Sequence, residues 1–276
     1  DFCLSRGLGD VYKRQPYCRA LDLEHPVVNL SESQQLERQI DILIEKKVAV
    51  ASFTFGVPET RLIRKMHEHD IIVMGTATSV EEALANEAAG VDIIVTQGSE
   101  AGGHRGSFLK QDGEYPMIGS ISLIPQVADA VRVPVIAAGG IMDGRGVLAS
   151  LILGASGVQM GTAFLTSQES GADIAYKQAI LNSTETSTVL TNAFSGKMAR
   201  GIRNDFVNYL SQFNGEVPEY PIQNQLTSAI RKASTANHDD SMMSLWSGQT
   251  PRLATSRSAQ EIVTSIVNQI EEMRLR

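Results

Sequence analysis

Hydrophobic and polar positions change period along the chain from residue 32 onward. The segment 32–47 places Leu36, Ile40 and Leu43 at helical spacing, which predicts an amphipathic helix. Further helices are predicted over the segments 58–70, 79–90, 121–131 and 144–154. Nearly continuous apolar runs lie between the helices and predict buried strands over residues 48–56, 71–77, 91–98, 133–140 and 156–164. Five strand–helix units of this kind predict an α/β fold with a parallel sheet covered by helices.

Local signals mark the ends of the helix over residues 79–90. Ser79 and Glu82 have the spacing of a capping box, in which each side chain bonds a backbone N–H at the helix start. Gly90 is the residue type that ends helices in the left-handed conformation. We therefore expect a helix bounded at both ends by its own sequence.

The regular pattern weakens after residue 186. The segment 187–205 indicates a further strand and an arginine-bearing loop, and 205–213 and 261–273 indicate helices. A polar insert around 212–250 lies between these two helices and is interpreted as a lid or a surface segment. Residues 1–15 show no periodicity, and we interpret them as a non-native or disordered leader preceding one domain over 16–276.

Composition excludes several classes of function. The 276 residues carry a formal net charge of −7 without a long basic run, which argues against nucleic-acid binding. No apolar run reaches the ~18 residues of a membrane span. Cys3 and Cys18 are too few for a disulfide scaffold and have no metal-site spacing, so we expect a cytoplasmic protein. The sequence leaves the oligomeric state open, and a homodimer is one possibility.

Three predicted strands end in glycine-rich segments: TQGSEAGGHRG (96–106), AAGGIMDGRG (137–146) and GVQMGTAF (157–164). Ligands bind at this end of parallel strands in α/β proteins. Gly139–Gly140 and Gly161–Thr162 each precede a predicted helix, a pattern that indicates an anion site or, alternatively, a tight turn. Asp143 is interpreted as a helix cap, and G-x-G-x-x-G of dinucleotide-binding folds is absent.

His104 lies within the first glycine-rich segment, between Gly103 and Gly106. An imidazole titrates near neutral pH, so it can accept a proton or stabilise an anion at a strand end. The alternative is a structural or surface histidine. The flanking glycines favour the catalytic interpretation because they permit close approach of a ligand to the backbone.

Together with SFTFGVP (52–58) and AFSGKMARGIRN (193–204), these three motifs resemble the nitronate monooxygenases, formerly called 2-nitropropane dioxygenases. The resemblance runs from about residue 32 to the end and implies an FMN-dependent (β/α)₈ TIM barrel. The family begins with three further βα units that this sequence lacks, so the resemblance implies an incomplete, N-terminally truncated barrel. It also implies that His104 is the active-site base and that FMN is bound by Gln97, Gly102, Gly103, Gly139, Gly140, Gln159, Met160, Gly161 and Thr162.

The implied reaction oxidises alkyl nitronates, or nitroalkanes, with O₂ to carbonyl compounds and nitrite. Tyr220 is interpreted as a packing residue, with a place in the lining of the substrate pocket as the alternative. Two other functions stay open. One is an FMN-dependent enoyl-thioester reductase using NAD(P)H, which shares the EAGGH and QMGT motifs; the other is an inactive fragment of the enzyme.

Overall fold

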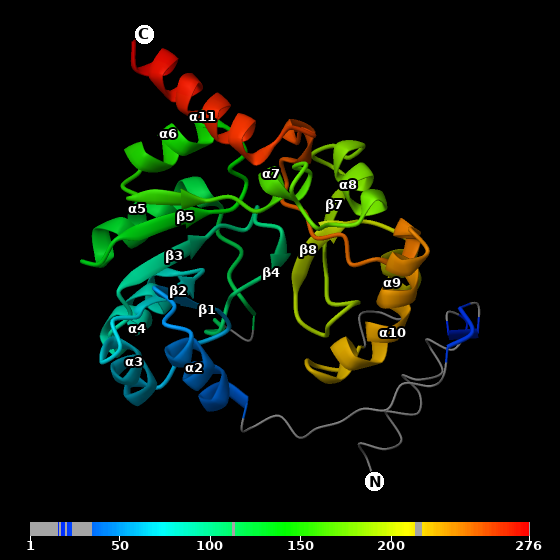
Figure 1. Cartoon of the computed structure of the whole chain (residues 1–276), viewed down its shortest axis with the longest axis horizontal. Helices are drawn as coiled ribbons and strands as arrows, with labels where there is room; N and C mark the ends of the chain where they lie inside the picture. The colour runs from blue at the N-terminus through cyan, green and yellow to red at the C-terminus, as the bar shows by residue number, and fades with distance from the viewer. Residues whose placement is uncertain are drawn as a thin grey trace. The chain divides into compact units, whose positions relative to one another are not determined.

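The computed structural model describes most of the chain, which divides into two compact units (Figure 1). Unit 1 contains Asp1–Ser31, Gly102–His104 and Phe164–Ser258, and unit 2 contains Glu32–Ala101, Arg105–Ala163 and Ala259–Arg276. The predicted leader, residues 1–15, lies outside the described residues. The described residues are 16, 18–19, 21–23, 35–111, 114–212 and 217–275.

Unit 2 is built on a five-stranded parallel sheet of order β1-β2-β3-β5-β6. Each of the five strands predicted from the sequence is present, in the predicted order, and the α/β fold class is confirmed. Their alternation with helices produces the parallel arrangement, because each crossover returns the chain to the same edge of the sheet. The strands are β1 (Val50–Phe53), β2 (Ile72–Ala77), β3 (Ile93–Gln97), β5 (Val135–Ala138) and β6 (Gly157–Gln159).

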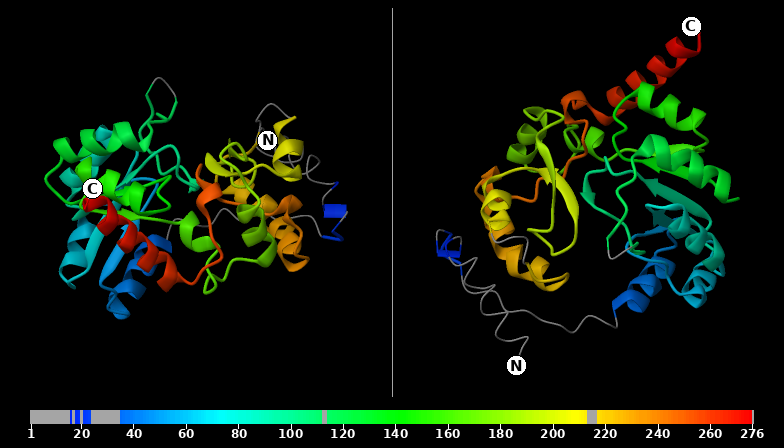
Figure 2. Two further views of the ribbon diagram at one scale, coloured as in Figure 1. Left: turned by 90° about the horizontal axis from the view of Figure 1, so that it is seen from above. Right: turned by 180° about the vertical axis from the view of Figure 1, so that it is seen from behind.

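Helices pack along one face of this sheet, as Figures 1 and 2 show. Two apolar clusters fill the interface, one around Ile63, Met66 and Val73 and the other around Ile94 and Leu123. Burial of such side chains contributes about 1.5–3 kcal/mol each relative to exposure. The helices of unit 2 are α2 (Gln35–Glu45), α3 (Thr60–His67), α4 (Val80–Ala89), α5 (Ser120–Ala130), α6 (Gly144–Ile152) and α11 (Ala259–Arg274). The short helix α7 (Thr162–Leu165) follows β6.

The predicted limits of α4 are confirmed. The Ser79 side chain accepts a hydrogen bond from the Glu82 backbone N–H, and Gly90 adopts a φ of 99° at the helix end. The second half of the predicted capping box is absent, because the Glu82 carboxylate does not return to the Ser79 backbone. It bonds other groups, which are described below.

Unit 1 contains a three-stranded antiparallel sheet of order β4-β8-β7. The sequence indicated only one strand after residue 186, whereas the structure has two there and adds a two-residue strand at His104. The strands are β4 (Gly103–His104), β7 (Thr188–Thr191) and β8 (Ala199–Ile202). The helical elements are α8 (Ile174–Leu181), α9 (Asp205–Ser211), α10 (Ile222–Ala236), η1 (Asp240–Met242) and η2 (Pro251–Leu253). Cys18 is buried in a core cluster with Phe194, Phe206 and Ile230.

Helix α10 occupies the stretch that the sequence indicated only as a polar insert. Three of its five buried residues are polar, so the apolar periodicity of a helix is weak there. Two of these polar side chains find backbone partners: Gln223 donates to the Ala193 carbonyl and Thr227 to the Phe194 carbonyl. Hydrogen bonding of this kind removes most of the cost of burying polar groups.

No helix in the described part of the chain is long and apolar enough to cross a membrane.

Candidate active site

Three parallel strands of unit 2 end at one edge of its sheet. Gln97 at the end of β3 is in register with Ala138 at the end of β5, and Ala138 is in register with Gln159 at the end of β6. The carboxyl edge of such a sheet is where α/β proteins bind ligands. The predicted cofactor residues that lie along this edge are Gln97, Gly139, Gly140, Gln159, Met160, Gly161 and Thr162.

Different structural requirements explain the glycines at this edge. Gly139 and Gly140 adopt φ values of 112° and 71°, so the turn after β5 itself requires glycine. A Cβ atom on Gly139 would also lie 3.1 Å from the Ala101 nitrogen. At Gly161, by contrast, an added Cβ would meet no atom within 4 Å. Gly161 therefore presents bare backbone next to space that a ligand can enter.

The first backbone N–H groups of α6 are bonded by side chains of the protein. Asp143 is the N-cap residue, as interpreted, and its Oδ1 accepts hydrogen bonds from the backbone N–H groups of Arg145 and Gly146 at 3.0 and 3.3 Å. The Gln269 side chain of α11 accepts from the Gly144 N–H at 2.8 Å. These side-chain oxygens occupy the N–H groups that an external anion would need.

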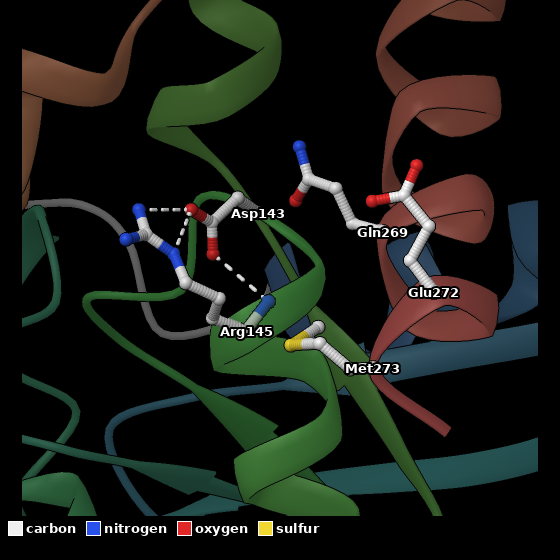
Figure 3. A pocket seen from close by; sticks show the side chains of 5 residues that line it. All are labelled: Asp143, Arg145, Gln269, Glu272 and Met273. Atoms are coloured by element: carbon white, nitrogen blue, oxygen red, sulfur yellow. Dashed lines mark hydrogen bonds and ion pairs between the residues drawn. The ribbon is translucent and has the colours of Figure 1, made fainter. Parts of the chain in front are cut away.

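A surface pocket of about 250 Å³ lies between α6 and α11 (Figure 3). Its lining carries charges of both signs, and the Arg145 guanidinium is paired with Asp143 at 2.5 Å. The pocket residues are Asp143, Arg145, Gln269, Glu272 and Met273. No group of three metal-ligating side chains occurs among the described residues here or elsewhere.

The segment after His104 is fixed by hydrogen bonds within unit 2. The buried Arg105 side chain donates to the Gln97 carbonyl at 2.5 Å and to the Pro116 carbonyl at 3.1 Å. The Gly106 N–H donates to Gln97 Oε1 at 2.8 Å. The Gln97 side-chain oxygen, which the family resemblance implies in flavin binding, therefore holds the chain beside His104.

Glu82 is fully buried and accepts four hydrogen bonds. The N–H and hydroxyl of Thr78 each donate to Oε2 at 2.7 Å. The N–H groups of Phe108 and Leu109 donate to Oε1 at 2.6 and 2.9 Å. A buried carboxylate is costly unless its oxygens are satisfied, and these four donors satisfy it. Glu82 therefore ties the start of α4 to the segment that follows His104.

His104 lies in unit 1 on strand β4, in register with Ala199 of β8. Its Nε2 is 2.7 Å from the Ser195 hydroxyl oxygen. Its ring centroid lies 5.2 Å from that of Trp246, with the planes tilted by 57°. Phe194 packs edge-on against the same indole at 5.5 Å. Strand pairing, the contact with Ser195 and aromatic packing thus hold the histidine in place.

The two glycines before His104 also differ. A Cβ on Gly102 would lie 2.5 Å from the Gly248 nitrogen, so the close approach of the chain's own backbone explains this glycine. Gly103 adopts a φ of 77°, and a Cβ there would meet no atom within 4 Å. Of the two, only Gly103 leaves room for a ligand at the position of a side chain.

The contacts of Ser195 assign the tautomer of His104. The Ser195 hydroxyl donates to the Lys197 carbonyl at 3.2 Å and accepts from the Lys197 N–H at 3.3 Å. Because a hydroxyl has one proton, all three contacts are satisfied together when Nε2–H of His104 donates to Ser195. Nδ1 is then the nitrogen that carries the lone pair.

Burial lowers the pKa of His104 below its usual value, and the nearby charges of Lys197 and Arg231 lower it further. Burial disfavours the charged imidazolium, and two cations repel it. The imidazole is therefore neutral at neutral pH, which is the form that accepts a proton from a substrate.

Several residues of this region carried no recognisable signal in the sequence. Ser195 and Lys197 lie in the AFSGKMARG motif, which contributed only to the family resemblance. Trp246 is the chain's one tryptophan, and this could have been used as a signal.

Tyr220 is 52% exposed, and this exposure argues against packing in the core. Glu100 accepts hydrogen bonds from the Ser120 N–H and hydroxyl at the start of α5, a structural role.

Comparisons with known proteins agree with the family that the sequence resembles. The family model "Nitronate monooxygenase" matches residues 9–269. A probable nitronate monooxygenase of Staphylococcus aureus strain MSSA476 is 60% identical over 259 residues, which is 94% of this chain and 73% of the relative. The protein of strain MRSA252 is 59% identical over the same length and the same shares of both chains.

Two solved structures are also similar to the chain. A nitroalkane oxidase from Streptomyces ansochromogenes superposes with a TM-score of 0.92 at 34% identity, over 98% of this chain and 78% of that one. FabK from Thermotoga maritima superposes with a TM-score of 0.74 at 30% identity, over 88% of this chain and 74% of that one. The chain therefore belongs to the nitronate monooxygenase family, and the expected flavin-dependent oxidoreductase is confirmed.

Proposed function

We propose that this chain binds FMN and oxidises alkyl nitronates with O₂ to a carbonyl compound and nitrite, with His104 as the catalytic base for neutral nitroalkanes. The observation that carries the proposal is the partly buried His104, whose pKa is lowered and whose Nε2 lies 2.7 Å from the Ser195 hydroxyl oxygen. A base of lowered pKa remains unprotonated at neutral pH and can remove the α-proton of a nitroalkane.

The residues at the sheet edge of unit 2 fit the phosphate end of FMN. Gly161 faces space where an added Cβ would meet nothing within 4 Å, and bare backbone N–H groups are suitable donors to phosphate. In this proposal Gly139, Gly140, Gln159, Met160, Gly161 and Thr162 hold the phosphate, and Gln97, Gly102 and Gly103 contact the flavin. When bound, the flavin supplies electron transfer between substrate and O₂.

His104 has two roles in the proposed reaction. With a neutral nitroalkane, the imidazole of His104 takes the α-proton, and Ser195 keeps the ring oriented through Nε2. With a preformed nitronate no proton need be removed, so the histidine only positions the anion. Reaction with the two substrate forms therefore depends on His104 to different extents.

We also propose a cytoplasmic location, and homodimers as the form to test first. The low cysteine content supports the first of these proposals. Gel filtration with light scattering measures the oligomeric state directly.

The test is an assay of the purified chain with propyl-2-nitronate and O₂. We expect O₂ uptake, release of nitrite, and a flavin that mass spectrometry of the denatured protein identifies as FMN. The matched assay supplies NAD(P)H and an enoyl thioester, the substrates of the alternative reductase. Consumption of NAD(P)H without nitrite release in the first assay would overturn the proposal, as would a purified chain that takes up no flavin.

A further inference from the structure

Arg231 is a partly buried guanidinium whose hydrogen-bond partners, among the described residues, are neutral. On α10, its Nε donates to Thr227 Oγ1 at 3.1 Å. Its Nη2 donates to the Asn224 carbonyl and side-chain oxygens at 2.9 and 2.8 Å. Within the part of the chain that the structure describes, no carboxylate pairs with it. Burying a charge without an opposite charge costs free energy, so such an arginine favours an anionic ligand.

Arg231 is connected to the catalytic histidine through two residues. Its partner Thr227 donates to the Phe194 carbonyl, and the next residue, Ser195, contacts His104 at 2.7 Å. The geometry therefore joins α10, the 194–195 segment and β4 in one hydrogen-bonded group within unit 1. The positive charge of Arg231 lowers the pKa of His104.

Lys197 brings a second cation to the same place. Its backbone N–H and carbonyl both bond the hydroxyl of Ser195. The backbone of Lys197 is therefore fixed to the residue that contacts His104. Its side chain is partly buried and also acts electrostatically on His104. Lys197 and Arg231 are thus two positive charges that lower the pKa of His104.

We propose that Lys197 and Arg231 form an anion subsite next to His104 that binds the O–N–O end of a nitronate. Arg231 is in this view a specificity-determining residue that favours the preformed anion over the neutral nitroalkane. The proposal rests on the proposed function for the identity of the anion, whereas the subsite itself follows from the two cations and the geometry around Ser195.

The first experiment needs no turnover. Propionate is the probe, because its carboxylate has two oxygens on one planar centre and one delocalised negative charge, as a nitronate has. NMR of ¹⁵N-histidine, with the His104 signal assigned from His104→Asn, follows titration of the parent chain. We expect saturable propionate binding that raises the pKa of His104, and binding at least ~10-fold weaker in Arg231→Met, as expected for loss of a charged hydrogen bond.

Arg252→Met is the matched control. Arg252 is exposed and pairs with Glu185 at 2.8 Å, so the same substitution there removes one positive charge from unit 1 away from the proposed subsite. We expect unchanged propionate binding in this variant. Arg231→Lys keeps the positive charge but loses the planar set of N–H donors of the guanidinium. We expect its affinity for propionate to stay within ~3-fold of the parent, because the charge contributes more to binding here than the donor geometry does.

The second experiment compares substrates. In Arg231→Met we expect KM for propyl-2-nitronate to rise ~10-fold while KM for 2-nitropropane changes by less than ~3-fold, with flavin content unchanged. Equal propionate binding in Arg231→Met and the parent would overturn the subsite. Equal losses with both substrates, or loss of flavin, would overturn it too, because they would assign Arg231 to the fold or to the cofactor.

Failure of the proposed function is distinguishable from failure of the subsite. A parent chain that binds propionate and releases no nitrite from any nitronate would refute the function and leave the subsite standing. If Arg231→Met does not fold, Lys197→Met carries the same test because it removes the second cation. Unchanged propionate binding in Lys197→Met would then overturn the proposal.

Discussion

His104 Nε2 lies 2.7 Å from Ser195 Oγ, although 91 positions separate the two residues in the sequence. Ser195 in turn exchanges two hydrogen bonds with the backbone of Lys197. The hydroxyl is thus fixed by the chain itself, and the imidazole is oriented by the hydroxyl. This relationship makes His104 a positioned base and leads to the first three predictions.

Replacing His104 by Asn should separate the two substrate forms. We expect turnover of neutral 2-nitropropane to fall by ~10²–10⁴, the usual contribution of a general base. Turnover of the preformed nitronate should fall far less because no proton has to be removed. Nitrite release measures both rates, and the visible absorbance of the flavin checks that the cofactor is still bound. Full activity on the neutral substrate would show that another group is the base.

Replacing Ser195 by Ala removes the acceptor for His104 Nε2–H. Because that acceptor stabilises the imidazolium as well, its loss should lower the pKa of His104 further and shift the acid limb of the kcat/KM profile to lower pH. We also expect kcat on 2-nitropropane to fall about tenfold, as for loss of one hydrogen bond. Ser195→Thr, which keeps a hydroxyl, should restore most of the rate. A shift of the acid limb to higher pH would instead indicate that Ser195 donates to Nε2.

The lowered pKa of His104 also predicts a pH dependence of stability. The unfolded chain regains the usual imidazole pKa of 6.5, so between that value and the lower folded pKa only the unfolded state binds the proton. Above pH 6.5 this group leaves stability unchanged, and stability falls as the pH decreases toward the folded pKa. Thermal melts across this range should show a larger acid loss for the parent than for His104→Asn. Identical acid losses would contradict the assigned burial of a neutral imidazole.

Gly161 tests the cofactor site in unit 2. A side chain there meets no protein atom within 4 Å, so Gly161→Val should leave the melting temperature of the flavin-free chain unchanged. It should weaken FMN binding at least ~10-fold by intruding on ligand space. Gly171→Val is the matched control, because a Cβ at Gly171 also meets nothing within 4 Å. Fluorescence titration with FMN measures the affinity, and equal affinities in the two variants would refute the phosphate assignment.

Glu82 predicts a stability effect that its neighbour does not share. Glu82→Gln replaces an acceptor of four hydrogen bonds with an amide that must direct N–H groups at N–H donors. We expect a loss of about 2–4 kcal/mol in the free energy of unfolding, measured by denaturant titration. Glu81 is the control: it is exposed and, among the described residues, bonds Gln111, so Glu81→Gln should change stability by less than ~0.5 kcal/mol. Similar effects of the two substitutions would contradict the role assigned to Glu82.

Local features of the chain were predictable because their physics is local. The five parallel strands follow from apolar runs that alternate with helical patterns, and α4 begins at Ser79 and ends at Gly90 because those residues satisfy the helix ends. Helix α10 was not predictable in this way. Its buried face carries Gln223, Thr227 and Ser234 besides two apolar residues, so hydrogen bonds to carbonyls make up a large part of its contacts.

The candidate site likewise has parts that the sequence predicts and parts that it does not. By itself the sequence determined the glycine-marked strand ends and the histidine among the glycines, because these depend only on strand order and residue type. Only the tertiary structure decided which groups form hydrogen bonds with the residues of the site and of the neighbouring helix ends. Ser195 reaches His104, Gln269 of α11 caps α6 in place of an anion, and Glu82 holds Phe108 rather than completing its capping box. These bonds span 91, 125 and 26 positions, and hydrogen bonds at such separations form only once packing has brought the partners together.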